Sequence, residues 1–178
     1  MHGNYVALPS VETLIEKLTQ ALKPYFPTKL PQAEQPIIIG IETGGYWIAS
    51  AIHQAIAPDT ELGRLNITFY RDDFTKIGLH PTVKPSSLPT NIDGKTIILI
   101  DDVLHSGRTI RAAMNEIFDY GRPQRIILAI LIDRGEREIP VQADIVAETI
   151  QLEPGNHIKL DGPKPFKLTV KSNTDHVS

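Results

Sequence analysis

The stretch IILIDDVLHSGRT, residues 97–109, decides both the expected fold and the expected site. It opens with four apolar residues rich in β-branched side chains, which predict a short buried strand. Two adjacent carboxylates, Asp101 and Asp102, follow this strand. The backbone N–H groups of a helix start, a glycine and hydroxyl side chains then suit a terminal phosphate, while upstream carboxylates suit ribose hydroxyls. We expect one loop to bind both parts of a phosphorylated sugar.

The alternative for this stretch is an ordinary strand-to-helix turn in which Asp and Ser cap the helix, and a lone S-G-x-T pattern favours that alternative. Two acidic residues after a strongly apolar strand, directly before a loop of small residues, go beyond what a cap requires. The residues expected to bind the ligand here are Asp101, Asp102, Val103, Leu104, His105, Ser106, Gly107, Arg108 and Thr109.

The rest of the chain alternates apolar strands with amphipathic helices. We expect strands at 37–41, 65–69, 96–100 and 126–132, and helices at 11–22, 46–56 and 107–120. Continuous apolar strands separated by helices are typical of a mostly parallel sheet covered on both faces, so the fold class is α/β. Short strands within 145–171 are expected to form a small cap. Residues 71–95, rich in proline and poor in periodicity, are expected to form a flexible flap.

Composition narrows the classes of function. The 178 residues fit a single domain, 1–178, and the formal net charge of −3 argues against a whole-surface attraction to nucleic acid. The chain has no cysteine, no secretory pattern at its start and no apolar run of the ~20 residues that a span needs, so we expect a cytoplasmic protein without membrane association. The 6 histidines never fall at the i, i+4 spacing of a helical metal pair, so we expect no transition-metal site. The sequence also has no G-x-S-x-G elbow, so we do not expect a Ser/His/Asp hydrolase.

Three loops leave the carboxyl ends of expected parallel strands, at 42–45, 101–109 and 133–139. Ligands of open α/β sheets bind beyond these strand ends, so we expect the three loops to converge on one site.

The segment 97–109 resembles the signature for 5-phosphoribosyl 1-diphosphate (PRPP) of type I phosphoribosyltransferases. Three more segments resemble the PyrR family, which comprises uracil phosphoribosyltransferases that can also act as RNA-binding attenuators of pyrimidine operons. They are LNITFYRDD (65–73), IRAAMNEIFDYGRPQRIILAILIDRGEREIP (110–140) and AD (143–144). The resemblance implies a type I phosphoribosyltransferase fold with a cap, or hood, and a flap. It also implies a reaction that converts uracil and PRPP to UMP and pyrophosphate with Mg²⁺.

By this resemblance, Ser106 to Thr109 hold the 5-phosphate, while Asp101 and Asp102 hold the ribose hydroxyls and lie near Mg²⁺, which is bound mainly through substrate and water. Thr43, Gly44 and Gly45 form the pyrophosphate loop, although Gly44 and Gly45 alone also fit a plain turn after a strand.

The best-known members of the family carry basic residues where Glu42 and Gly44 stand. Backbone donors, Mg²⁺ and Arg71 or Lys76 of the flap are therefore expected to neutralise the pyrophosphate instead. Arg71 is further expected to assist the leaving group, within a segment Tyr70 to Asp73 that by composition alone suits a solvated turn.

The same resemblance implies that Asp133, Arg134, Gly135 and Arg137 lie beside the nucleobase. Arg134 can stack on the base or meet a phosphate, and its alternative is a surface salt bridge to Glu136 or Glu138. Main-chain groups near Thr149 and Ile150 are expected to recognise uracil.

The expected partners are PRPP, uracil, UMP and a second copy of the chain, as a homodimer or a higher homo-oligomer. Leader mRNA is an alternative partner. The first helix offers only Lys17 against Glu12 and Glu16, so attenuation ranks below enzyme activity. A phosphoribosyltransferase for another base, such as a purine, is a third interpretation.

Overall fold

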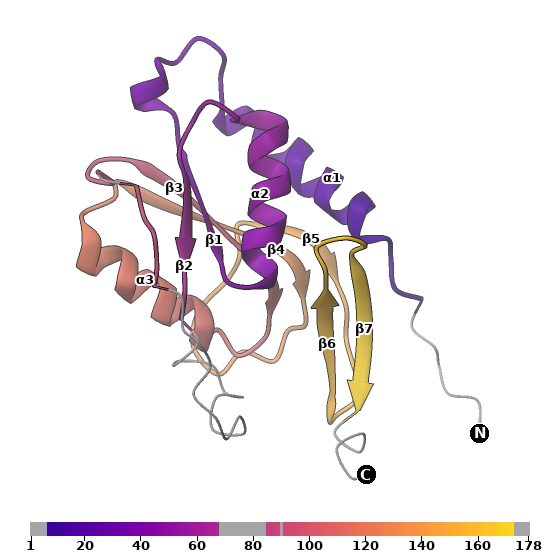
Figure 1. Ribbon diagram of the computed structural model, residues 1–178. Helices are drawn as coiled ribbons and strands as arrows, with labels where there is room; N and C mark the ends of the chain where they lie inside the picture. Colours follow the sequence, from indigo (N-terminus) through magenta and orange to yellow (C-terminus); the bar gives the residue numbers. More distant parts are fainter. Residues whose placement is uncertain (1–6, 68–84, 90, 173–178) are drawn as a thin grey trace, which may run out of the picture.

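A five-stranded parallel sheet forms the centre of the computed structural model, which describes residues 7–67, 85–89 and 91–172 (Figure 1). Its strand order is β2-β1-β3-β4-β5, and every neighbouring pair is parallel. The strands are β1 (Ile37–Ile41), β2 (Leu62–Leu65), β3 (Thr96–Leu104), β4 (Arg125–Asp133) and β5 (Ile145–Thr149). A separate antiparallel hairpin consists of β6 (Asn156–Asp161) and β7 (Lys167–Ser172). The predicted α/β class is confirmed.

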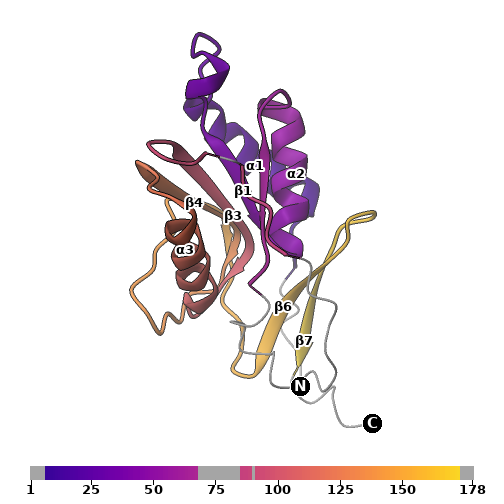
Figure 2. The same ribbon diagram turned by 60° about the vertical axis from the view of Figure 1, so that its left-hand side comes forward.

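The helices cover the two faces of the sheet unequally (Figure 2). Helices α1 (Val11–Leu22) and α2 (Gly44–Ile56) pack on one face, and α3 (Arg108–Tyr120) packs on the other. Short 3₁₀ helices, η1 (Lys23–Tyr25) and η2 (Gln32–Glu34), follow α1. Ser10 caps the start of α1, since its hydroxyl accepts a bond from the Thr13 N–H at 3.4 Å.

The buried strands explain why the sequence shows no alternation of apolar and polar residues. Ile98 and Ile100 of β3 pack in the core under α1 and α2, whereas Ile97 and Leu99 pack under α3. Because both faces are covered by helices, both sets of side chains must be apolar.

The bounds of β2, α2 and β3 differ from the predictions. The edge strand β2 ends at Leu65 because it pairs only along β1, which ends at Ile41; residues 68 and 69 lie outside the described part. Helix α2 begins at Gly44 instead of residue 46. Strand β3 continues to Leu104, since it pairs with β4 along that length.

The predicted cap is also smaller than expected. Strand β5 joins the main sheet beside β4, so only the β6–β7 hairpin stands apart from it. Of the predicted flap, residues 71–84 and 90 lie outside the described residues. Its described part includes Ser87, whose main chain exchanges two hydrogen bonds with that of Arg64, at 2.7 and 2.8 Å.

Candidate active site

Two carboxylates, Asp101 and Asp102, stand near the carboxyl end of the central strand β3. Asp101 is 2% exposed, and its Oδ1 accepts a bond from the Asp102 N–H at 3.0 Å. Oδ1 of Asp102 accepts from the Val103 N–H at 2.9 Å. Because β3 pairs with β4 past both residues, the rigid sheet holds these carboxylates.

The turn after β3 leads directly into α3, as predicted. Gly107 precedes the helix with a φ of 92°, a left-handed conformation that favours glycine. Ser106 is buried, and its hydroxyl accepts from the Arg108 N–H at 3.3 Å. A Cβ atom on Gly107 would lie 3.0 Å from the side chain of Ile139. The turn is therefore compact and opens a helix, which is the arrangement that suits a phosphate.

The loop after β4 holds this turn from behind. The carbonyl of Leu104 accepts from the Arg134 N–H at 2.9 Å. The carbonyl of Ser106 accepts from the N–H groups of Glu138 and Ile139, at 3.0 and 3.2 Å. On the surface, His105 pairs with Glu136 and Arg108 with Glu138. These bonds confirm the predicted convergence of the second and third loops.

Arg137 joins the same two loops through its guanidinium. It donates to the carbonyls of His105 and Val141, both at 2.9 Å, and to that of Gly135 at 3.0 Å. It also contacts the Asp133 carboxylate at 2.6 Å. Partial burial of Asp133 raises its pKa. The hydrogen bonds from Arg137 and the Gly135 N–H, with the charge of Arg137, outweigh that effect and leave the pKa below its ordinary value.

The first turn of α2 approaches both carboxylates closely. A Cβ atom on Gly44 would lie 2.2 Å from Oδ2 of Asp102, and one on Gly45 would lie 2.8 Å from Oδ1 of Asp101. A plain turn would not require glycine at both positions, so close approach explains the pair. The peptide bond between Glu42 and Thr43, at the start of this loop, is cis.

The start of α2, the end of β3 and the start of α3 line one cavity of about 570 Å³, whereas no residue of the third loop, 133–139, lines it. From the predicted site it includes Thr43, Gly44, Asp101, Asp102, Val103 and Thr109. The opposite wall is β6, which contacts β3 and lies at the carboxyl ends of the strands (Figure 1). The remaining residues of the predicted phosphoribosyl site do not line the cavity; they are Gly45, Leu104, His105, Ser106, Gly107 and Arg108.

Sequence patterns did not reveal the wall formed by Trp47 and β6. Its residues are Trp47, His157, Ile158, Lys159, Leu160, Asp161 and Gly162. The Lys159 ammonium lies 2.7 Å from the Asp161 carboxylate and holds the pKa of Asp161 below its ordinary value. Only the tertiary position of the hairpin brings these side chains to the site, and no local motif signals that position.

The residues predicted beside the nucleobase do not line this cavity. Arg134 donates to the carbonyl of Asn156 at 2.9 Å and lies 3.8 Å from Glu136. The Ile150 N–H bonds the Asp133 carbonyl at 2.9 Å, while the Thr149 side chain is exposed. A role for Arg134, Thr149 and Ile150 in base recognition stays a prediction. Tyr70, Arg71, Asp72, Asp73 and Lys76 lie outside the described residues.

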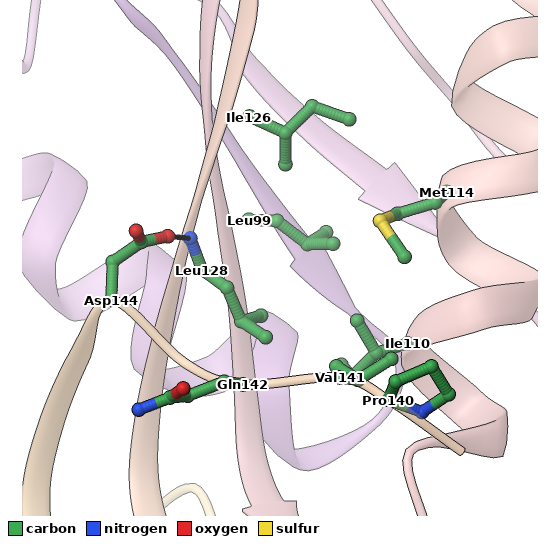
Figure 3. Close-up of a pocket in the computed structure, with 9 residues that line it drawn as sticks. All are labelled: Leu99, Ile110, Met114, Ile126, Leu128, Pro140, Val141, Gln142 and Asp144. Atoms are coloured by element: carbon green, nitrogen blue, oxygen red, sulfur yellow. Dashed lines mark hydrogen bonds between the residues drawn. The ribbon is translucent and has the colours of Figure 1, made fainter.

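A smaller cavity of about 210 Å³ lies between α3, β4 and residues 140–144 (Figure 3). Apolar side chains, among them Ile110, Met114 and Leu128, line most of it. Asp144 at its rim accepts a bond from the Leu128 N–H at 2.8 Å, so this carboxylate ties residue 144 to β4. None of the predicted site residues lines this cavity.

The described carboxylates limit how the protein can hold a metal ion. Within residues 7–67, 85–89 and 91–172, no group of three or more His, Asp or Glu side chains could hold a metal. Asp101 and Asp102 supply two carboxylates at the cavity. That donor set fits Mg²⁺, which keeps several waters and typically takes one or two carboxylates plus substrate oxygens.

This fold, with a phosphate-type turn and paired carboxylates at the strand ends, defines a phosphoribosyltransferase domain. The family described as "Phosphoribosyl transferase domain" matches residues 3–160. A hypoxanthine-guanine phosphoribosyltransferase from Bacillus anthracis shares the fold, with a TM-score of 0.60 and 22% identity over 84% of each chain. A purine phosphoribosyltransferase from Pyrococcus horikoshii gives a TM-score of 0.59 and 22% identity over 79% of this chain and 83% of that one.

Sequence relatives narrow the family further. The chain is 45% identical to "Bifunctional protein PyrR" of Pseudomonas paraeruginosa, over 93% of this chain and 96% of the relative. It is 49% identical to the protein of the same name from Nitrosococcus oceani, over 79% of this chain and 80% of the relative. The chain belongs to the PyrR family. Among the described residues, no helix has the length and apolar character needed to cross a membrane.

Proposed function

We propose that the protein transfers the phosphoribosyl group of PRPP to uracil, giving UMP and pyrophosphate. The observation that carries this proposal is one cavity in which the first turn of α2, the two β3 carboxylates and the start of α3 meet. Membership of the PyrR family supports uracil as the base.

In this proposal each segment binds one part of the substrate. The turn Ser106 to Thr109 binds the 5-phosphate through N–H groups at the start of α3. Asp101 and Asp102 accept hydrogen bonds from the ribose hydroxyls and keep the sugar ring oriented. Thr43, Gly44 and Gly45 bind the pyrophosphate at the start of α2, where a helix terminus favours negative charge.

The reaction breaks the bond between the anomeric carbon and pyrophosphate and forms a bond from that carbon to N1 of uracil, which loses its proton. Mg²⁺, held mainly by substrate and water near Asp101 and Asp102, would neutralise charge on the leaving pyrophosphate. Positive charge develops on the sugar in the transition state, and the two carboxylates stabilise it. The hairpin β6–β7 restricts water on the other side of the cavity. The proposal also includes Arg71 as the residue that assists the leaving group. It further places Arg134, Thr149 and Ile150 beside the base.

The test is formation of UMP from uracil and PRPP with Mg²⁺, for the protein and for Asp102→Asn. We expect product with the natural protein and a strongly reduced rate with the variant. A panel of bases separates the alternatives, since product from hypoxanthine but not from uracil would assign a purine enzyme. No product from any base, despite a folded protein, would refute the proposal.

A second candidate function is pyrimidine-dependent attenuation through leader mRNA, because the PyrR relatives are named bifunctional. The described structure offers little basic surface on α1, since its Lys17 pairs with Glu148 at 3.1 Å. RNA binding requires cations that meet phosphates. A gel shift with pyrimidine leader RNA, with and without UMP, tests this function; tight sequence-specific binding would establish it.

We also propose that the protein acts in the cytoplasm as a homodimer or a higher homo-oligomer, as the resemblance to the PyrR family implies. Sedimentation velocity at several protein concentrations tests the assembly, and a single monomeric species would contradict it.

A further inference from the structure

The pyrophosphate loop begins with an acidic residue, Glu42, although its proposed ligand is a polyanion. Glu42 follows β1 directly, and its N–H bonds the carbonyl of Leu65 on β2 at 2.8 Å. The next residue, Thr43, lines the cavity. A carboxylate one residue from a pyrophosphate site lowers affinity for the ligand unless a cation compensates for it.

That cation is Arg64. Its Nε lies 3.1 Å from Oε1 of Glu42, with the two side chains 29% and 17% exposed. The contact is an ion pair at short distance and not a hydrogen bond, since the buried Nε atom has no hydrogen-bond partner in the described structure. The guanidinium also stands over the ring of Tyr46, 5.8 Å from its centroid.

Several contacts hold Arg64 in this place. Arg64 stands opposite Gly40 in the register of the parallel β1–β2 pair. Its main chain is fixed on the other side by the two bonds with Ser87. Tyr46 belongs to the first turns of α2, the helix that begins with the pyrophosphate loop.

We propose that Arg64 is a positioning residue that neutralises Glu42 and so allows the loop 42–45 to accept pyrophosphate. It acts through Glu42 and not by touching the ligand, since Arg64 does not line the cavity and its guanidinium is already engaged by Glu42 and Tyr46. This inference rests on the proposed function. Arg64, on β2, then supplies the positive charge that compensates for Glu42.

The test combines Arg64→Gln, Glu42→Gln and the double variant, with Arg125→Gln as a control that removes a positive charge at the opposite end of the sheet. Calorimetry measures the affinities for Mg²⁺–PRPP and for UMP, which lacks the pyrophosphate. Removing one positive charge several ångströms from a polyanion, at the effective dielectric of a protein surface, changes a binding constant by about tenfold. We therefore expect Arg64→Gln to weaken PRPP binding roughly tenfold and to leave UMP binding unchanged.

Glu42→Gln alone is expected to bind PRPP at least as tightly as the natural protein. The double variant is expected to bind it as tightly as the natural protein, because both charges are gone. This variant keeps the test valid if Arg64→Gln does not fold. Weak PRPP binding by the double variant would show that Arg64 contacts pyrophosphate directly and would overturn the inference, as would unchanged binding by Arg64→Gln. Failure of the natural protein to bind PRPP at all would instead refute the proposed function.

Discussion

Replacing Arg137 by Gln tests whether the two loops form one unit that presents the phosphate turn. The guanidinium contacts the Asp133 carboxylate at 2.6 Å and donates to three main-chain carbonyls, at residues 105, 135 and 141. Gln keeps part of the length and polarity of the side chain but loses the charge and most of the donors. The variant therefore leaves partly buried oxygens without their partner.

The size of the effect follows from this geometry. Removing one partner of a buried ion pair costs about 3–5 kcal/mol, and a hydrogen bond to a charged group contributes about 1.5–3 kcal/mol. These contributions are not additive, and the side chains of Arg137 and Asp133 are 21% and 17% exposed. We expect a loss of about 2–4 kcal/mol in the free energy of unfolding. Urea unfolding followed by the fluorescence of Trp47, the only tryptophan in the sequence, measures it.

A specific role in phosphate binding requires a second measurement. The ratio of the uridine and UMP dissociation constants reports what the phosphate contributes to binding. We expect this ratio to fall in Arg137→Gln, because the carbonyl of residue 105 loses its donor and the turn relaxes. Arg122→Gln is the matched control, since Arg122 donates to the carbonyls of Phe118 and Gly121 at the far end of α3. Unchanged stability together with an unchanged ratio would refute the reasoning; reduced stability with an unchanged ratio would leave Arg137 a purely structural residue.

Three further predictions follow from the same structure. Gly44→Ala should lower kcat/KM for PRPP roughly a hundredfold, because the new Cβ would displace the Asp102 carboxylate, and kinetics with PRPP varied measures this. Asp133 has a pKa below its ordinary value of 3.8, so its ionised carboxylate contributes fully to stability above about pH 4. This contribution is lost as the pH falls through the folded-state pKa. The difference in unfolding free energy between the natural protein and Asp133→Asn should therefore narrow below about pH 4 in urea titrations. Ile98→Ala should cost about 2–5 kcal/mol of unfolding free energy, since Ile98 is fully buried, whereas Tyr120→Ala at an exposed position should cost less than about 0.5 kcal/mol.

The sequence predicted the order of the main elements because their periodicity is set locally. The apolar stripe of α1 and the continuous apolar residues of β1, β3 and β4 follow directly from burial on one face or on two. The two acidic residues after Ile100 looked like the end of a strand. They continue β3 because pairing with β4 extends past them, with Val103 opposite Ile132. Pairing partners are tertiary information, so a local pattern cannot set this boundary.

In the candidate site, too, local patterns predicted one part and tertiary contacts determine the other. The residues that supply backbone N–H groups or carboxylates were predicted, because they follow apolar strands and precede helices. The wall formed by β6 was not predicted, since it depends on where a hairpin some fifty residues farther along the chain folds back.

The supporting contacts escaped prediction for a related physical reason. A turn that presents N–H groups to an anion must satisfy its carbonyls elsewhere, and here the loop after β4 provides the donors for residues 104, 105 and 106. A loop that carries Glu42 beside a polyanion must similarly find a cation, which β2 provides. Neither donor is adjacent in sequence to the group that it serves. We therefore expect Arg64 and Arg137 to affect ligand binding without touching the ligand, so that substitutions at these two positions alter binding of pyrophosphate and of 5-phosphate respectively.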